Sequence, residues 1–352
     1  MANWKWKLGL TALFLGLAFF LLQFMLATER IREWASAAER PGPNDAPRVV
    51  LISQELDNPY WRAVETGARE AAERYGWLLE YTGPRRLNPD EQARLLDKAI
   101  AGRPDALLVQ GVGEAAFREG VARATRAGIP VVTIDTDEPG SGRIAYVGTD
   151  NVRFGRAMGE RVAQASGGRG RIGVLIGDAR APNQLQRLAG FREAIAAYPE
   201  LSIVDVRESR ISRLYAAAEA ERMLKAHAPV DVLVGFSSLD GPGMLEGAAR
   251  VGAAPRIFAT DDVPETIEAI RGCRIALTLV QQPEEMGRAA VRLLNELRSG
   301  RDIPEYIYTE AKAVSAAEAD ASAGAVGSGE AESGAAESGS GVGEVGSGGG
   351  CR

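Results

Sequence analysis

Between residues 48 and 310, short apolar runs alternate with longer amphipathic segments, and this alternation limits the possible folds more than any other feature of the chain. The runs are rich in Val and Ile and have no polar face, which is typical of parallel strands covered by helices on both sides. They lie at 49–52, 106–109, 130–134, 172–176, 231–235 and 275–280. The helical segments lie at 59–75, 89–101, 114–127, 152–165, 184–197, 213–226 and 284–298.

These units are too numerous for one sheet of ordinary size, so the sequence predicts an α/β protein with two doubly wound parallel-sheet lobes. In such sheets a ligand binds beyond the carboxyl ends of the strands. The residues that follow each apolar run are therefore the candidates for a binding site.

The first strand end carries two aromatic residues at the start of a helix. Asn58 and Pro59 form a good N-cap and first-turn pair, so capping alone would explain Asn58. Tyr60 and Trp61 follow. Neighbouring helical residues point about 100° apart, so the two rings cannot both face the core in the same direction. We expect at least one ring to face the crevice at the strand ends, although core packing alone is the ordinary role of such rings.

Polar side chains follow the other predicted strands in the same way. Carboxylates and amides in these places can cap turns, and an arginine there can simply be exposed, but together they suit a ligand with many hydroxyl groups. Unpaired buried polar groups cost about 1–3 kcal/mol each, so such a site would reject ligands that lack the matching hydroxyls. The residues are Asp135 after 131–134, Arg187 on the helix after 171–176, Asp261 after 256–259, and Gln281 after 276–280.

Six short motifs, in this order, resemble the ribose/galactose type of periplasmic sugar-binding protein, the type I substrate-binding component of ABC transporters. The resemblance covers about 48–310. The motifs are Asp57-Asn-Pro-Tyr-Trp61 with Gly67 and Ala71, Ala127-Gly-Ile-Pro-Val-Val-Thr-Ile-Asp135, Val147-Gly-Thr-Asp-Asn151, Arg187-x-x-Gly-Phe191, Thr260-Asp261 and Gln281-x-Pro283.

The resemblance implies two lobes joined by a three-segment hinge that close over a sugar. The implied crossings lie near 148–151, 278–283 and 303–307, giving lobe 1 as 48–150 with 282–304 and lobe 2 as 151–281 with 305–315. Residues implied to bind the ligand are Asn58, Tyr60, Trp61, Asp135, Thr136, Arg187, Ser238, Asp261 and Gln281.

Three positions depart from the pattern of this family. Thr136 stands where an arginine is frequent, and Ser237-Ser238 stands where Asn-Asp is usual. Ile211 occupies the position that frequently holds a second aromatic ring in lobe 2. These departures leave the identity of the sugar or polyol open.

The two ends of the chain differ from the body. Leu8–Ala27 is an uncharged apolar run of 20 residues, long enough for a membrane-spanning helix. We therefore expect 1–35 to be a membrane anchor, with a cleaved signal segment as the alternative, followed by a linker at 36–47. Residues 316–352 consist mainly of Ala, Gly, Ser and Glu without aromatic residues, which predicts a disordered acidic tail.

Charge and composition exclude several classes of function. The net charge of −6 comes almost entirely from the acidic tail, so the body has no basic excess for nucleic acid. The single histidine, His227, rules out sites with several histidine ligands. No complete dinucleotide or phosphate-binding loop occurs, so we expect no cofactor and no enzyme activity. A divalent cation at the acidic pairs 135/137 and 261/262 is a weaker alternative to sugar contact. Cys273 lies between predicted elements and Cys351 lies in the tail, so we expect no structural disulfide.

The sequence thus favours a monomeric extracytoplasmic solute-binding protein, anchored in the cell membrane by one segment, that delivers a sugar or polyol to an ABC transporter permease. The alternative partner is a two-component sensor kinase in the membrane. A sugar-responsive repressor has a similar two-lobed body, but it would need a DNA-binding motif where this chain has its apolar segment.

Overall fold

The computed structural model describes residues 20–21, 23–25, 28 and 46–316. Most of Leu8–Ala27 falls outside these residues, as do most of the expected linker at 36–47 and nearly all of the expected acidic tail. Within the described part of the chain, no helix is both long and apolar enough to cross a bilayer. The chain divides into two compact units, 1–46 and 47–352, and the second contains the strand–helix body.

The first lobe is built on a six-stranded sheet in the order β11-β5-β4-β3-β1-β2. All its strand pairs are parallel. The strands are β1 (Arg48–Ile52), β2 (Leu78–Thr82), β3 (Ala106–Val109), β4 (Val131–Ile134), β5 (Ala145–Thr149) and β11 (Tyr306–Thr309). The helices that alternate with β1–β4 are α2 (Pro59–Tyr75), α3 (Pro89–Ala101) and α4 (Ala115–Arg126).

The second lobe repeats this arrangement in the order β12-β10-β9-β8-β6-β7. Its pairs are parallel except for the edge strand β12, which runs antiparallel to β10. The strands are β6 (Arg169–Ile176), β7 (Glu200–Glu208), β8 (Val232–Gly235), β9 (Arg256–Thr260), β10 (Leu277–Val280) and β12 (Lys312–Val314). The helices are α6 (Pro182–Ile195), α7 (Arg213–Ala226), α8 (Asp240–Arg250) and α9 (Pro264–Arg271).

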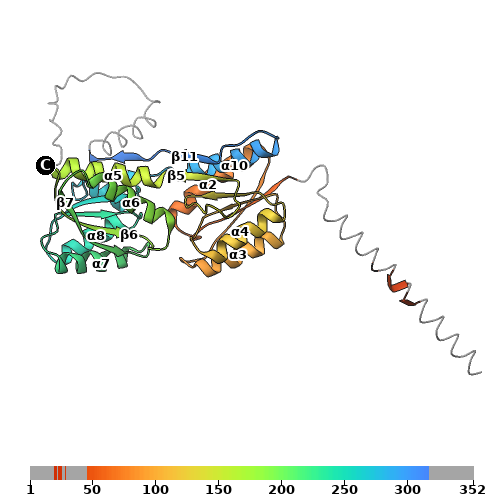
Figure 1. Cartoon of the computed structure of the whole chain (residues 1–352), viewed down its shortest axis with the longest axis horizontal. Helices are drawn as coiled ribbons and strands as arrows, with labels where there is room; N and C mark the ends of the chain where they lie inside the picture. Colours follow the sequence, from red (N-terminus) through yellow and green to blue (C-terminus); the bar gives the residue numbers. More distant parts are fainter. Residues whose placement is uncertain (1–19, 22, 26–27, 29–45, 317–352) are drawn as a thin grey trace, which may run out of the picture. The chain divides into compact units, whose positions relative to one another are not determined.

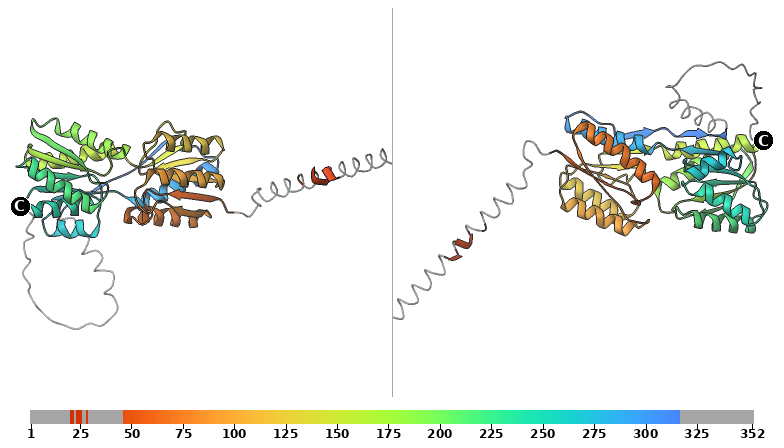
Figure 2. Two further views of the ribbon diagram at one scale, coloured as in Figure 1. Left: turned by 90° about the horizontal axis from the view of Figure 1, so that it is seen from below. Right: turned by 180° about the vertical axis from the view of Figure 1, so that it is seen from behind.

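Three segments connect the lobes, and Figure 2 shows them running between the two bodies. The first joins β5 to α5 (Asn151–Ser166), and the second joins β10 to α10 (Pro283–Arg298). The third lies between β11 and β12. The predicted crossing at 303–307 is wrong by a few residues, because β11 pairs with β5 and still belongs to the first sheet. The assignment of all of 305–315 to lobe 2 fails for the same reason.

Each crossing helix packs against the first helix of the lobe that it enters. Helix α5 packs on α6, and helix α10 packs on α2 (Figure 1). Glycines allow the close approach: a Cβ on Gly155 would overlap the backbone oxygen of Arg187, and one on Gly287 would overlap that of Val64. The segments that connect the lobes are therefore tightly joined to the helices that carry Arg187 and the Tyr60–Trp61 pair.

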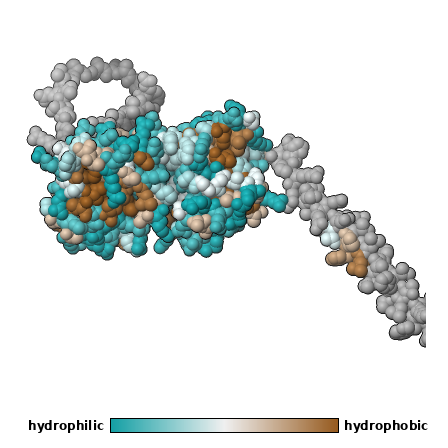
Figure 3. Space-filling model, viewed as in Figure 1, coloured by the Kyte–Doolittle hydropathy of each residue, from teal (hydrophilic) through white to brown (hydrophobic). Residues whose placement is uncertain are grey.

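The central strands of both sheets are buried, as the continuous apolar runs predicted. Strands β1, β3 and β4 supply the core of lobe 1, and β6, β8 and β9 supply that of lobe 2. The visible face of the molecule is largely hydrophilic, with hydrophobic patches on both lobes (Figure 3).

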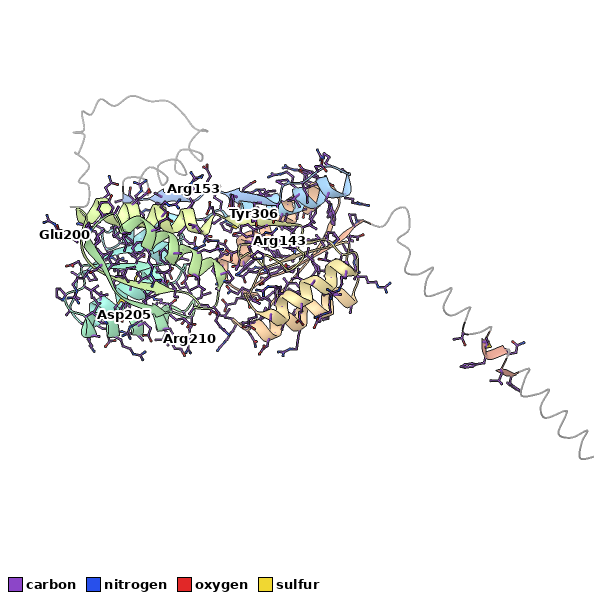
Figure 4. The ribbon with its side chains drawn as sticks, in the orientation of Figure 1. Arg143, Arg153, Glu200, Asp205, Arg210 and Tyr306 are labelled. Carbon is purple, nitrogen blue, oxygen red and sulfur yellow. The ribbon has the colours of Figure 1, made fainter. Side chains whose placement is uncertain are left out.

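Two further observations concern the periphery of the body. Arg143 lies over the ring of Tyr306, with 4.8 Å between the guanidinium carbon and the ring centre (Figure 4). This contact ties β11 to the loop before β5. Cys273, which follows α9, is disulfide-bonded. The prediction of no structural disulfide is therefore wrong, because a cysteine that lies between elements can still be paired.

Candidate functional site

The carboxyl ends of the strands in both lobes face one pocket, with an empty volume of about 460 Å³ that includes the solvent at its opening. Eight of the nine predicted site residues line it: Asn58, Tyr60, Trp61, Asp135, Arg187, Ser238, Asp261 and Gln281. The pocket thus brings together residues that lie up to 223 positions apart in the sequence.

Thr136 is the predicted residue that does not line the pocket. Its side chain is fully buried, and its hydroxyl donates to the Asp135 Oδ2 atom at 3.0 Å. Thr136 is thus placed behind Asp135 and fixes the direction of that carboxylate. The residue frequent at this position in the resembled family is an arginine, and here a neutral hydroxyl behind Asp135 takes its place.

Asp135 is held by donors from several elements. The Tyr60 hydroxyl donates to Oδ1 at 2.8 Å, and the Gln110 amide donates to Oδ2 at 2.9 Å. Asn183, on α6 of the other lobe, also donates to Oδ2 at 3.3 Å. The last of these bonds joins the two lobes directly at the pocket.

The two aromatic residues take different places, as their helical spacing requires. Trp61 is only 2% exposed and packs into the lobe 1 core, while Tyr60 is half-buried and directs its hydroxyl to Asp135. The rings meet edge to face with 5.8 Å between their centres. Burial and the negative charge of Asp135 raise the pKa of Tyr60 well above its ordinary value, so the hydroxyl remains a hydrogen-bond donor.

Arg187 is buried at the junction between lobe 2 and the crossing segments. Its Nε atom donates to Asn151 Oδ1 at 2.8 Å, and its Nη2 atom donates to Gln281 Oε1 at 2.6 Å. Its Nη1 atom donates to the backbone oxygen of Phe236 at 2.9 Å. The guanidinium lies 4.5 Å from the centre of the Phe154 ring. The alternative interpretation from the sequence, that Arg187 is simply an exposed arginine, is therefore wrong.

Asp261 faces Asp135 from the other lobe. It accepts the backbone N–H of Gln281 at 3.3 Å and the Gln281 side-chain amide at 3.1 Å. Burial raises the pKa of Asp261 to about 6, and the positive charge of Arg187 and the Gln281 hydrogen bonds offset this only in part. Burial therefore favours the protonated form of Asp261 more than it would be favoured in an exposed carboxyl.

Further pocket residues were missed by the sequence argument. Gln54, Asn183, Gln184, Phe236 and Ser237 line the pocket in addition to those predicted. Phe236 and Ser237 directly follow β8, so a complete survey of strand ends would have found both. Asn183 and Gln184 lie in the first turn of α6, where the sequence resembles any helix start. Ile211 also lines the pocket and has φ of 50°, which is unusual for a β-branched residue.

Among the described residues, no group of three or more His, Cys, Asp or Glu side chains could hold a metal ion. Asp137, one of the residues considered for a cation, forms an ion pair with Arg143 at 2.6 Å. Asp137 is not among the residues that line the pocket.

The strand–helix body of this chain is similar to curated relatives and to solved structures. The "Ribose import binding protein RbsB" of Haemophilus influenzae is 24% identical over 267 residues, covering 76% of this chain and 91% of the relative. The crystal structure of "GanP, a glucose-galactose binding protein from Geobacillus stearothermophilus" is 40% identical with a TM-score of 0.76, covering 78% of this chain and 99% of that one.

A third likeness is to the structure titled "XylFII-LytSN complex", which is 30% identical with a TM-score of 0.74 and covers 78% of this chain and 99% of that one. The family model described as "Periplasmic binding protein domain" matches residues 49–302, which include most of both lobes and every pocket residue named above. The chain belongs to the periplasmic binding protein domain family.

Proposed function

We propose that this protein is an extracytoplasmic solute-binding protein that captures a sugar or related polyol between its two lobes. The observation that carries the proposal is the placement of Asp135 and Asp261, one from each lobe, on one pocket with Tyr60 and Trp61. Two carboxylates can accept hydrogen bonds from hydroxyls on opposite sides of a ligand, while the aromatic rings accommodate its C–H face.

The chemistry of the pocket supports a hydroxyl-rich ligand. Asn58, Ser238 and Gln281 present groups that both donate and accept, as do the hydroxyls of a polyol. Arg187 supplies donors from the base of lobe 2. In this account Thr136 acts through Asp135 and does not touch the ligand.

Ligand capture would proceed by closure of the lobes, which is the hinge motion that is general for periplasmic binding proteins. Asn183 of lobe 2 already bonds to Asp135 of lobe 1, and Arg187 contacts both Asn151 and Gln281 on the crossing segments. A sugar that contacts both lobes would favour the closed arrangement by its differential affinity for it.

We further propose that the protein delivers its ligand to an ABC transporter permease and works as a monomer outside the cytoplasm. The names of relatives support this role, since one is a ribose import binding protein. The apolar run Leu8–Ala27 would hold the body at the membrane. A tethered binding protein needs no diffusion through the surrounding compartment to meet its permease.

A second candidate function is a membrane-anchored co-receptor for a sensor kinase. The structure titled "XylFII-LytSN complex" favours it, because there a protein similar to this chain was solved together with a second protein. Crosslinking in native membranes would separate the two roles. Capture of a permease subunit supports transport, and capture of a kinase supports sensing.

A thermal-shift screen over pentoses, hexoses, inositols and sugar acids tests ligand binding. A ligand at a hundredfold excess over its Kd stabilises the folded state by about 2.7 kcal/mol, which raises the melting temperature by a few degrees. We expect at least one polyol to give this shift, and Asp135→Ala and Asp261→Ala each to abolish it. No shift with any member of the panel would contradict the proposal.

A further inference from the structure

A second cavity adjoins the sugar pocket and has an empty volume of about 700 Å³, counting the solvent at its opening. The two cavities share five lining residues: Asn58, Tyr60, Ser238, Asp261 and Gln281. The residues that line only the second cavity define what we call the annex. They are Pro59, Ala63, Leu239, Asp262, Val263, Pro264 and Pro283.

Both lobes contribute to the annex. Pro59 and Ala63 lie on the first turns of α2 in lobe 1, while Leu239 and Val263 directly precede α8 and α9 in lobe 2. Pro283 begins α10 on the second crossing segment. A group that fills the annex would therefore contact both lobes, as a sugar in the main pocket would.

The walls of the annex are mainly apolar. Six of the seven annex residues are proline, alanine, leucine or valine, whose side chains form no hydrogen bonds. An ordered water needs two to four polar partners, so much of this wall cannot satisfy one. An apolar group placed there would instead remove apolar surface from water, which is favourable.

The charge of the annex limits its occupant further. No lysine, arginine or histidine lines the second cavity, whereas the carboxylates of Asp262 in the annex and of the shared residue Asp261 do. Asp262 is exposed, so it lies at the rim. An anionic group such as a phosphate or a carboxylate would meet negative charge without any cation to pair with.

We propose that the annex is a second subsite, and that the preferred ligand is a polyol with a neutral apolar substituent on one of its hydroxyls, such as an alkyl or aryl glycoside. The polyol part occupies the main pocket and the substituent occupies the annex. The ligand extends from one cavity into the other along the five shared residues. This inference rests on the proposed function, because it requires a polyol in the main pocket.

The test uses the full-length protein and the sugar that gives the largest thermal shift. Its complete set of mono-O-benzyl derivatives, one for each hydroxyl and both anomers of the glycoside, is titrated by calorimetry beside the parent sugar. One derivative should bind about tenfold more tightly than the parent, because benzyl burial in the annex outweighs the cost of ordering it. The matched mono-O-phosphate should bind more weakly than the parent.

A variant assigns the gain to the annex. Val263→Trp fills the cavity, so the ratio of benzyl to parent affinity should fall to about one. Leu214→Trp, at an exposed position on α7 that is 67% accessible, is the control and should keep the wild-type ratio.

The possible results separate the two proposals. If the parent sugar binds but every benzyl derivative binds at least tenfold more weakly, the annex subsite is wrong and the proposed function stands. If a derivative gains affinity and Val263→Trp keeps the gain, the substituent lies elsewhere and the annex is again wrong. If neither a parent sugar nor any derivative binds, both proposals fail.

Discussion

Asp135 and Asp261 occupy equivalent positions in the two lobes. Each follows the fourth strand of its lobe, each has left-handed backbone geometry with φ of 65° and 63°, and each donates its N–H to the neighbouring strand, at Val147 and Leu279. Left-handed geometry is unfavourable for residues other than glycine and is tolerated best by Asp and Asn. The repeated strain directs two carboxylates into one pocket, which identifies these turns as the centre of the site.

The pH dependence of polyol binding should report the protonation of Asp261. The pKa of its carboxyl in the folded protein is about 6, and a proton competes with ligand hydroxyls for the carboxylate oxygens. Affinity should therefore be constant above pH 6 and fall up to about tenfold per pH unit below it. Calorimetric titrations between pH 4.5 and 8 measure this. An unchanged affinity across that range would show that Asp261 does not accept a bond from the ligand.

The Asp261 carboxyl should also make the stability of the ligand-free protein depend on pH. The pKa in the folded state, about 6, lies above the ordinary value of about 3.9, so the folded state binds this proton more tightly than the unfolded state. The contribution of Asp261 to the free energy of unfolding thus falls as the pH rises from about 4 to about 6. Asp261→Asn should remove this fall and be more stable than the wild type at pH 7, as measured by urea unfolding.

Removal of Arg187 should affect both stability and binding. Its side chain is 2% exposed and joins Asn151, Phe236 and Gln281, so Arg187→Ala leaves buried acceptors without donors. We expect a loss of roughly 2–4 kcal/mol in the free energy of unfolding and no detectable polyol binding. Arg192→Ala, at an exposed position on the same helix, is the control and should change stability by less than about 0.5 kcal/mol. Equal effects for both variants would contradict this role.

The close packing of α5 on α6 should be intolerant of a single methyl group. In Gly155→Ala the new Cβ would overlap the backbone oxygen of Arg187, so α6 must shift. We expect a loss of about 1–3 kcal/mol in stability together with weaker polyol binding, because Arg187 moves with its helix. In Gly272→Ala, outside the site, the nearest atom lies 3.4 Å from the new Cβ, so this variant serves as the control. Wild-type polyol affinity in Gly155→Ala would show that ligand binding does not depend on the close packing of α5 on α6.

An ion pair between the lobes should influence the release of ligand. Arg180 before α6 contacts Glu114 before α4 at 3.1 Å, and both side chains are partly exposed. Exposed pairs contribute at most about 1 kcal/mol, so Glu114→Gln should raise the dissociation rate by no more than about fivefold, and high salt should remove the difference. Stopped-flow kinetics measure this rate. Glu193→Gln, which breaks the Arg156–Glu193 pair within one lobe, should leave the rate unchanged.

The sequence predicted the fold well where the pattern was strong. Continuous apolar runs such as 106–109 and 49–52 became buried central strands, because only strands covered on both faces lack polar residues. The edge strands β2, β7 and β11 have half-exposed patterns and were not among the predicted strands. For β11 this displaced the third crossing, since pairing with β5 is a tertiary contact that the local sequence does not specify.

Most of the candidate site was also predictable, because strand ends of parallel sheets meet at one edge. The placement of Thr136 could not be predicted, because the direction of its side chain depends on the left-handed turn at Asp135. Nor could the burial of Arg187, which depends on Asn151 and Gln281 meeting it from two crossing segments. Both depend on contacts between residues far apart in the sequence.

The most direct test of the account is a crystal structure of the protein with the sugar that gives the largest thermal shift. The account predicts one sugar in the pocket between the lobes, with hydroxyls within hydrogen-bond distance of both Asp135 and Asp261 and one face against Tyr60 or Trp61. A sugar that contacts only one of the two carboxylates, or that binds outside this pocket, would contradict it.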